Sequence, residues 1–250
     1  MDRTEKTNGF TLIEVLVSIG VISILIGLLL PALGSARDRS RKLASAVNLR
    51  SIGQIIDLYI QSADELYPAP SPGEYYQSPH PEIRGTMPHW AISSRWHEFF
   101  AESYPWQEYK QVFLAPGAQR DTSSQPVMTS IFPSYQYSAS FLGHPTIWTD
   151  RQISDDQWPR LERSVKRTMV QFTSSKALMW DIEMPYIRRP LLKDATYNLL
   201  ENTPMLFADQ HVANHIPADA SQAVFNRATY AAHPIQKLHN TPNGVYGRDY

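Results

Sequence analysis

The sequence has no cysteine among its 250 residues, and this absence removes two classes of architecture. Neither a disulfide framework nor a cysteine-based zinc site is possible. The chain does not need disulfides or a structural zinc ion for stability, because a domain of this size can bury an adequate hydrophobic core. The formal net charge is only -1, which argues against a general nucleic-acid binder.

Familiar catalytic signatures are also lacking. The sequence contains no Gly-rich phosphate loop, no Gly-x-Ser-x-Gly elbow and no Ser-x-x-Lys pair. Histidines, tyrosines and carboxylates are plentiful, but their spacing does not predict general acid and base chemistry. We therefore expect no catalytic residues and no cofactor.

What the sequence does have is a long uncharged apolar run. From Val15 to Ala36 no side chain is charged, and a helix of roughly 22 residues would be about 33 Å long, enough to cross a bilayer. A secretory signal peptide has a shorter apolar region of about 7–15 residues, so the simplest form of that class does not fit. Cleavage after the run, near Ala36, stays open as an alternative.

Glu14 is unexpected at the start of this run. A carboxylate inside a membrane costs about 2.5–3.5 kcal/mol at the helix centre, so it usually has a partner. The neighbouring cations do not supply one, because Lys6 lies more than two helical turns away and Arg37 would lie at the opposite face of the bilayer. A cut just before Phe10 would free an amino group about one helical turn from Glu14.

The stretch GFTLIE at residues 9–14, followed by the apolar run, resembles the prepilin-type cleavage and methylation signature of type IV pilins and type II secretion pseudopilins. The resemblance implies that a prepilin peptidase cuts between Gly9 and Phe10 and methylates the new amino terminus on Phe10. It also implies that Glu14 pairs with the amino terminus of a neighbouring subunit during assembly. The alternative is an ordinary signal anchor in which Glu14 is a tolerated interfacial carboxylate.

Charge counting and the resemblance disagree on orientation in the membrane. The cations that follow the span outnumber those before it: Arg37, Arg39, Arg41 and Lys42 against Arg3 and Lys6. The positive-inside rule would therefore keep the carboxyl-terminal side in the cytoplasm. The resemblance implies the reverse, with the leader peptide of residues 1–9 in the cytoplasm, and we follow the resemblance.

The helical pattern continues beyond the membrane span. Apolar residues that recur at spacings of three and four include Leu43, Val47, Ile52, Ile56 and Ile60. This period predicts an amphipathic continuation over 37–63, so that one helix runs from Phe10 to about Ala63. Residues 10–36 would be its transmembrane part, and Pro31 should kink it.

Residues 64–250 are expected to form an exported globular α+β domain with an antiparallel sheet. The predicted strands are 111–114, 134–140, 169–172, 177–181 and 204–212, and two of the apolar runs end on Asp181 and Asp209. The proline-rich stretch 68–88 predicts a loop, and 92–100 a short helix with Trp96, Phe99 and Phe100 facing a core. The resemblance implies a pilin-like fold, in which the long amino-terminal helix packs on this sheet.

Two groups of polar residues contain ligand-like side chains, and we assign a metal to neither. Asp209, His211 and His215 are the best zinc-like group, but on a strand residues four apart lie about 13 Å apart, too far to share one ion. Asp150, Asp155 and Asp156 lack the alternating ligands of a calcium loop. Hydrogen-bonded histidines and a solvated acidic turn are the simpler interpretations.

The leading functional hypothesis is a structural subunit, minor or pseudopilin-like, of a type IV pilus or a type II secretion pseudopilus. Its partners would be prepilin peptidase, other pilin or pseudopilin subunits and membrane lipid, with no nucleic acid. It would lie in the bacterial cytoplasmic (inner) membrane as a single-pass protein with its carboxyl-terminal domain exported, and in a filament after assembly. The alternatives are a membrane-anchored or filament-tip binding module exported by the same route, and an anchored enzyme.

Overall fold

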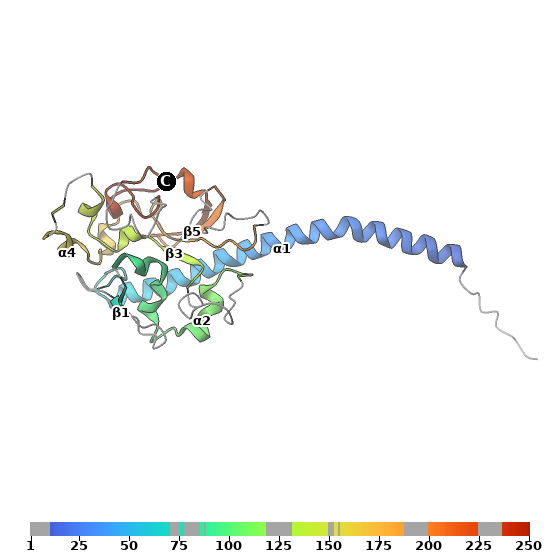
Figure 1. The fold of residues 1–250 in the computed structure, drawn as a ribbon, viewed down its shortest axis with the longest axis horizontal. Helices are drawn as coiled ribbons and strands as arrows, with labels where there is room; N and C mark the ends of the chain where they lie inside the picture. Colours follow the sequence, from blue (N-terminus) through green and yellow to red (C-terminus); the bar gives the residue numbers. More distant parts are fainter. Residues whose placement is uncertain are drawn as a thin grey trace, which may run out of the picture. The chain divides into compact units, whose positions relative to one another are not determined.

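The computed structural model describes residues 11–70, 76–77, 86–87, 89–118, 132–149, 153–154, 156–187, 200–224 and 237–250. The chain divides into two units, Met1–Ser40 and Arg41–Tyr250. Figure 1 shows the long helix α1 in blue to cyan and the sheet strands in yellow-green to orange. The predicted α+β, pilin-like class is confirmed by this helix and by a four-stranded antiparallel sheet.

Helix α1 spans Leu12–Ser62, close to the predicted range of Phe10 to Ala63. It runs without interruption through Pro31, although proline lacks an N–H and leaves the carbonyl of Gly27 without its usual donor. Gly27 has no side chain to meet the proline ring one turn later, and its surroundings are open. The kink expected at Pro31 stays a prediction.

The sheet in the second unit has the order β3-β4-β5-β6, with every neighbouring pair antiparallel. The strands are β3 (Tyr135–Tyr137), β4 (Ala177–Asp181), β5 (Thr203–Phe207) and β6 (Val212–His215). All five residues of both β4 and β5 are buried, as expected for central strands covered on two faces. The edge strand β6 is partly exposed.

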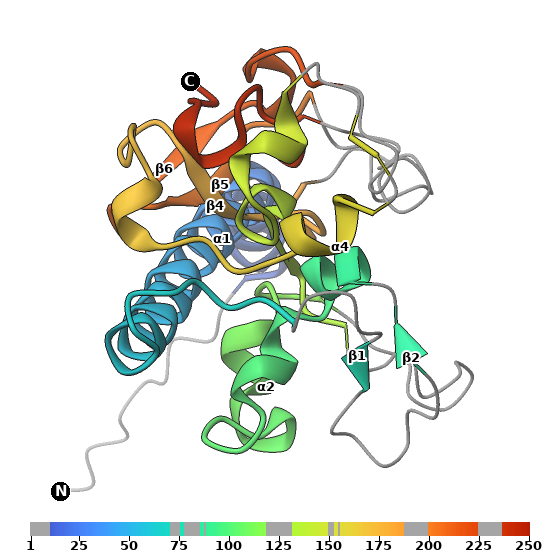
Figure 2. The same cartoon turned by 90° about the vertical axis from the view of Figure 1, so that its left-hand side faces the viewer.

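Different parts of the chain pack against the two faces of the sheet. One carries the main core, in which the α1 residues Leu49, Ile52, Ile56 and Ile60 lie with sheet residues such as Leu178 and Leu206. The other carries a smaller cluster in which Trp180, Met205 and Phe207 lie with residues from 220 onwards. Figures 1 and 2 both show this carboxyl-terminal segment, in orange to red, on the side of the sheet away from α1.

A third layer covers the far side of α1. It contains the 3-10 helix η2 (Trp96–Phe100) and the helix α2 (Trp106–Phe113), and the preceding 3-10 helix η1 (His89–Ser94) lies next to β3. Asn48 connects α1 to this layer, because its Nδ2 donates to the carbonyls of Gln111 and Leu114 at 3.0 and 3.1 Å. The second half of α1 therefore lies between the sheet and an aromatic lobe (Figure 2).

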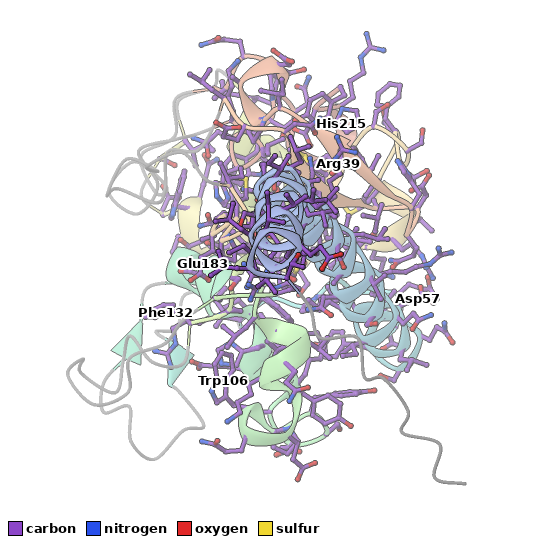
Figure 3. All side chains as sticks on the ribbon, turned by 90° about the vertical axis from the view of Figure 1, so that its right-hand side faces the viewer. Arg39, Asp57, Trp106, Phe132, Glu183 and His215 are labelled. Carbon is purple, nitrogen blue, oxygen red and sulfur yellow. The ribbon has the colours of Figure 1, made fainter. Side chains whose placement is uncertain are left out.

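The aromatic lobe partly confirms the prediction for 92–100. The segment is helical, but it forms two 3-10 turns separated at Arg95 instead of one helix. Trp96 and Phe100 are buried and Phe99 is partly buried in the core cluster. Trp106, labelled in Figure 3, extends the cluster from α2 and stacks on Phe113 with ring centroids 6.0 Å apart.

Among the strand predictions, 177–181 is confirmed as β4. The prediction 134–140 contains the shorter β3 followed by the 3-10 helix η3 (Ala139–Phe141). The prediction 204–212 is a hairpin, β5 to β6, with Asp209 in its turn.

Two strand predictions are wrong. Residues 111–114 close the helix α2, because Trp106, Tyr109 and Phe113 form an apolar face at helical spacing that outweighs the short apolar run. Met169 is the last residue of the 3-10 helix η5 (Arg167–Met169), which ends with the hydrogen bond from Val170 N to Arg167 O, and residues 170–172 form no strand.

The remaining elements are short. They are α4 (Trp158–Leu161), η4 (Pro145–Trp148), η7 (Pro217–Asp219) and η8 (Gly244–Tyr246). Most of the predicted loop 68–88 lies outside the described residues. Within it β1 (Tyr76–Gln77) and β2 (Thr86–Met87) pair antiparallel.

Candidate functional site

The first turn of α1 holds the predicted assembly residue Glu14 in a capping box. Thr11 is the N-cap, since its carbonyl accepts the first helical hydrogen bond, from Val15 N. The Thr11 N–H and the Thr11 hydroxyl both donate to Glu14 Oε2 at 2.8 Å, and Glu14 N donates to Thr11 Oγ1 at 3.3 Å. These reciprocal bonds satisfy donors that a helix start otherwise leaves unpaired.

The capping role of Glu14 was missed by the sequence reasoning, although a signal for it is present. The spacing Thr11-x-x-Glu14 before an apolar run is the usual pattern of a capping box. Glu14 Oε1 accepts no hydrogen bond from a described residue, because both Thr11 donors use Oε2. Gly9 and Phe10, the predicted processing residues, lie outside the described residues.

The apolar part of α1 is exposed on every side. Leu12, Leu28 and Leu33 have exposed fractions of 83%, 71% and 68%, and no residue of the most apolar 18-residue window is buried in the chain. Among the described residues, α1 is the helix that is long and apolar enough to cross a membrane. A helix that is apolar all round needs lipid or other helices as its surroundings.

Polar groups inside this apolar part are satisfied locally. Ser18 and Ser23 hydroxyls donate to the carbonyls of Glu14 and Ile19, each at 2.7 Å. Such bonds matter in a bilayer, where water cannot satisfy a hydroxyl group. The helix therefore carries its few polar side chains into an apolar environment without unpaired donors at these positions.

The zinc-like group weighed from sequence forms a stack of rings instead. His211 Nδ1 lies 2.5 Å from Asp209 Oδ1, and the His211 ring lies flat on Phe207 with centroids 4.5 Å apart. His215, labelled in Figure 3, packs on Tyr250 with centroids 4.3 Å apart. The described part of the chain contains no group of three or more His, Cys, Asp or Glu side chains placed to hold a metal ion. Of the calcium candidates, Asp150 and Asp155 lie outside the described residues.

Asp181 joins α1 to the sheet. The sequence predicts this aspartate at a strand end, and it is the last residue of β4, fully buried. Its Oδ2 accepts from Ser45 Oγ on α1 at 2.6 Å and from Tyr186 OH at 2.9 Å, while Oδ1 accepts from the N–H groups of Glu183 and Met184. Burial raises the pKa of the Asp181 carboxyl, and these four donors oppose the rise.

A second buried charge holds the carboxyl-terminal segment to the sheet. Lys176 Nζ lies 3.0 Å from Asp249 Oδ2, and both side chains are buried. Asp249 also accepts from Ala177 N at 2.8 Å and from Thr241 Oγ1 at 2.5 Å. Burial lowers the pKa of the Lys176 ammonium, and Asp249 opposes this change. Sequence reasoning missed this pair, because nothing local connects two residues so far apart.

Comparison with known proteins gives one match. Residues 6–30 match the family model described as the prokaryotic N-terminal methylation motif, and this range includes Gly9, Phe10 and Glu14. The chain thus carries a prepilin-type amino-terminal segment, as its resemblance implied. Comparisons with curated proteins and with solved structures gave no match.

Proposed function

We propose, from the premise that residues 6–30 are a prepilin-type methylation segment, that this chain is a structural subunit of a filament. The segment supports a prepilin-processed, pilin-like protein. The finer assignment is a minor or pseudopilin-like subunit of a type IV pilus or a type II secretion pseudopilus. Prepilin peptidase would cut between Gly9 and Phe10 and methylate Phe10.

The proposal divides the chain by task. Residues 1–9 are the leader, 10–36 cross the bacterial inner membrane once, 37–63 continue the helix, and 64–250 form the exported domain. The second half of α1 is buried against the sheet, so the exported domain is fastened to the same helix that anchors it. A force on the anchoring helix would therefore reach the domain through a packed interface.

The observation that carries the proposal is the exposed apolar surface of the first half of α1, which directly follows the predicted cleavage point within the matched segment. Side chains exposed around the whole helix gain about 25 cal/mol for each Å² of apolar surface removed from water. Lipid covers this surface in the membrane, and neighbouring helices would cover it in a filament. Gly20 and Gly27 lie seven residues apart with open space around them, which permits close helix approach.

Glu14 is placed to serve two partners. Oε2 caps its own helix through Thr11, which leaves Oε1 for a donor from another chain. A freed amino group on Phe10 of a neighbouring subunit would supply both a donor and the missing positive charge. In an apolar filament interior an unpaired Glu14 would be costly, so assembly favours the paired arrangement.

The test of this function is the mass of the amino-terminal peptide of the protein isolated from its native membrane. A peptide that begins at methylated Phe10 is expected, and a Gly9→Val variant should keep its leader. An intact leader on the unaltered protein, or a cut near Ala36, would overturn the proposal.

A further inference from the structure

The exported domain has a groove of about 600 Å³ beyond the end of α1. Its apolar lining includes Leu66, Pro70, Met169 and Tyr246, and its polar lining includes Arg163 and Lys166. The groove is of the size that binds a small ligand or a few side chains of a peptide. None of its residues has a part in the assembly role of the apolar helix.

Backbone hydrogen bonds fix the walls of the groove. Tyr67 N donates to Val165 O at 2.9 Å and Arg167 N donates to Glu65 O at 2.8 Å, so the two walls form a short antiparallel bridge. His144 N donates to Leu161 O at 2.8 Å and holds a third segment against them. The groove is therefore largely formed before any ligand arrives, which lowers the entropic cost of binding.

The two cations of the groove are available. Arg163 and Lys166 are exposed, and neither forms an ion pair with a carboxylate in the described part of the chain. Two carboxylates close to them in the described sequence already have partners. Glu65 lies 3.9 Å from Arg167, and Glu162 accepts from Trp158 Nε1 at 2.8 Å.

A third donor lies beside these cations. His144 also lines the groove, and its Nδ1 accepts from Thr146 N at 3.3 Å. With Nδ1 as acceptor, the neutral ring carries its proton on Nε2, which can donate. Burial and, to a smaller extent, the charge of Arg163 lower the pKa of His144, so both favour the neutral ring. The groove thus offers an apolar floor with donors and positive charge beside it.

We propose that this groove binds an acidic peptide segment of a partner protein, with a carboxylate side chain at Arg163 and Lys166 and an apolar side chain on the floor. Charge complementarity selects the carboxylate, since the described residues that line the groove include two cations, Arg163 and Lys166, and no acid. A sugar would need more hydrogen-bonding groups than this floor provides, because Leu66, Pro70 and Met169 offer none from their side chains. Peptide binding at the groove does not depend on the filament role, because it can be measured on the unassembled chain.

The experiment uses the full chain in nanodiscs of phosphatidylcholine, which carries no net charge. The probe is a fluorescein-labelled peptide of sequence Gly-Leu-Glu-Phe-Glu-Gly, and its partner has both glutamates replaced by glutamine. Fluorescence anisotropy gives the two dissociation constants. The acidic peptide should bind at least about tenfold more tightly than the glutamine peptide.

A pair of double variants separates the groove from general surface charge. Arg163→Gln with Lys166→Gln should weaken binding of the acidic peptide about tenfold or more. Arg50→Gln with Lys110→Gln makes the same charge change at exposed positions outside the groove lining and should leave binding within about twofold.

Three outcomes would overturn the inference. They are no binding of the acidic peptide at millimolar concentration, equal binding of both peptides, and equal losses in the two double variants. Tryptophan fluorescence spectra of each variant establish that its fold is retained. Failure here leaves the filament proposal standing, because the amino-terminal peptide mass does not depend on the groove.

Discussion

Substitution of Glu14 by glutamine separates its two proposed tasks. The amide oxygen of the introduced glutamine can still accept from the Thr11 N–H and hydroxyl, and glutamine is the other residue that closes a capping box. The negative charge is lost. Glu14→Gln therefore keeps the helix start and removes the partner of a neighbouring amino terminus.

Loss of the ion pair and loss of the N-cap should weaken assembly by different amounts, so an assembly assay can tell which task of Glu14 matters more. Breaking one side of a buried ion pair costs about 3–5 kcal/mol, and 3 kcal/mol is roughly a hundredfold change in an association constant. Losing an N-cap costs about 1 kcal/mol, which is roughly fivefold. If pairing dominates, Glu14→Gln should impair assembly far more than Thr11→Ala, which removes the cap and keeps the charge.

The assay is cross-linking of native membranes, followed by the ratio of multimer to monomer of this chain. The mass of the amino-terminal peptide from the same samples checks that cleavage and methylation are unchanged. Glu14→Ala, which removes cap and charge together, should assemble no better than Glu14→Gln. Normal assembly of Glu14→Gln with impaired assembly of Thr11→Ala would refute the pairing argument and leave Glu14 as a helix cap.

Three further predictions concern the unit Arg41–Tyr250, measured on the full chain in detergent by denaturant unfolding followed through tryptophan fluorescence. Lys176→Met should lower the free energy of unfolding by about 3–5 kcal/mol because it leaves Asp249 buried without its cation, and adding Asp249→Asn should recover most of the loss. Asp181 has a raised folded-state pKa, so its stabilisation is full below about pH 4 and is lost as the pH rises through that pKa. Asp181→Asn should therefore destabilise more at pH 4 than at pH 7, and an equal effect would contradict the argument. Gly53→Ala would place a Cβ against the Gln210 amide, which must move, and 3.0 Å from the buried Leu206 Cδ1, and an overpacking cost of about 1–3 kcal/mol should exceed a helix-propensity gain of up to about 1 kcal/mol. A rise in stability would show that α1 can move away from β5.

Local patterns in the sequence predicted α1 and β4 well. The period of apolar residues in the second half of α1 is a property of consecutive residues, and it placed the carboxyl-terminal end of the helix at about Ala63, one position from Ser62. The run 177–181 is apolar enough to be recognised as a buried strand ending on Asp181. The processing residues Gly9 and Phe10 stay a prediction, and the family model matches residues 6–30, which contain the short string from which they were predicted.

The sequence could not supply contacts between distant residues. Ser45 meets Asp181 across 136 positions, and no local pattern marks a serine on α1 as the donor to a buried carboxylate. The basic and apolar groove could not be predicted either, because it is assembled from separate segments near residues 66, 144, 163 and 246. The prediction for 111–114 failed for another reason, since three consecutive apolar residues fit a strand and a helix equally well.

The buried pair of Lys176 and Asp249 has a consequence for the timing of folding. On the proposed export route the chain crosses the membrane in sequence order, and Lys176 emerges before its partner, which lies 73 positions later. A buried ammonium without its carboxylate is too costly for the sheet to close around it. If the chain takes that route, the sheet would close around Lys176 only after residue 249 has crossed, so the domain would remain unfolded at this position until translocation is nearly complete.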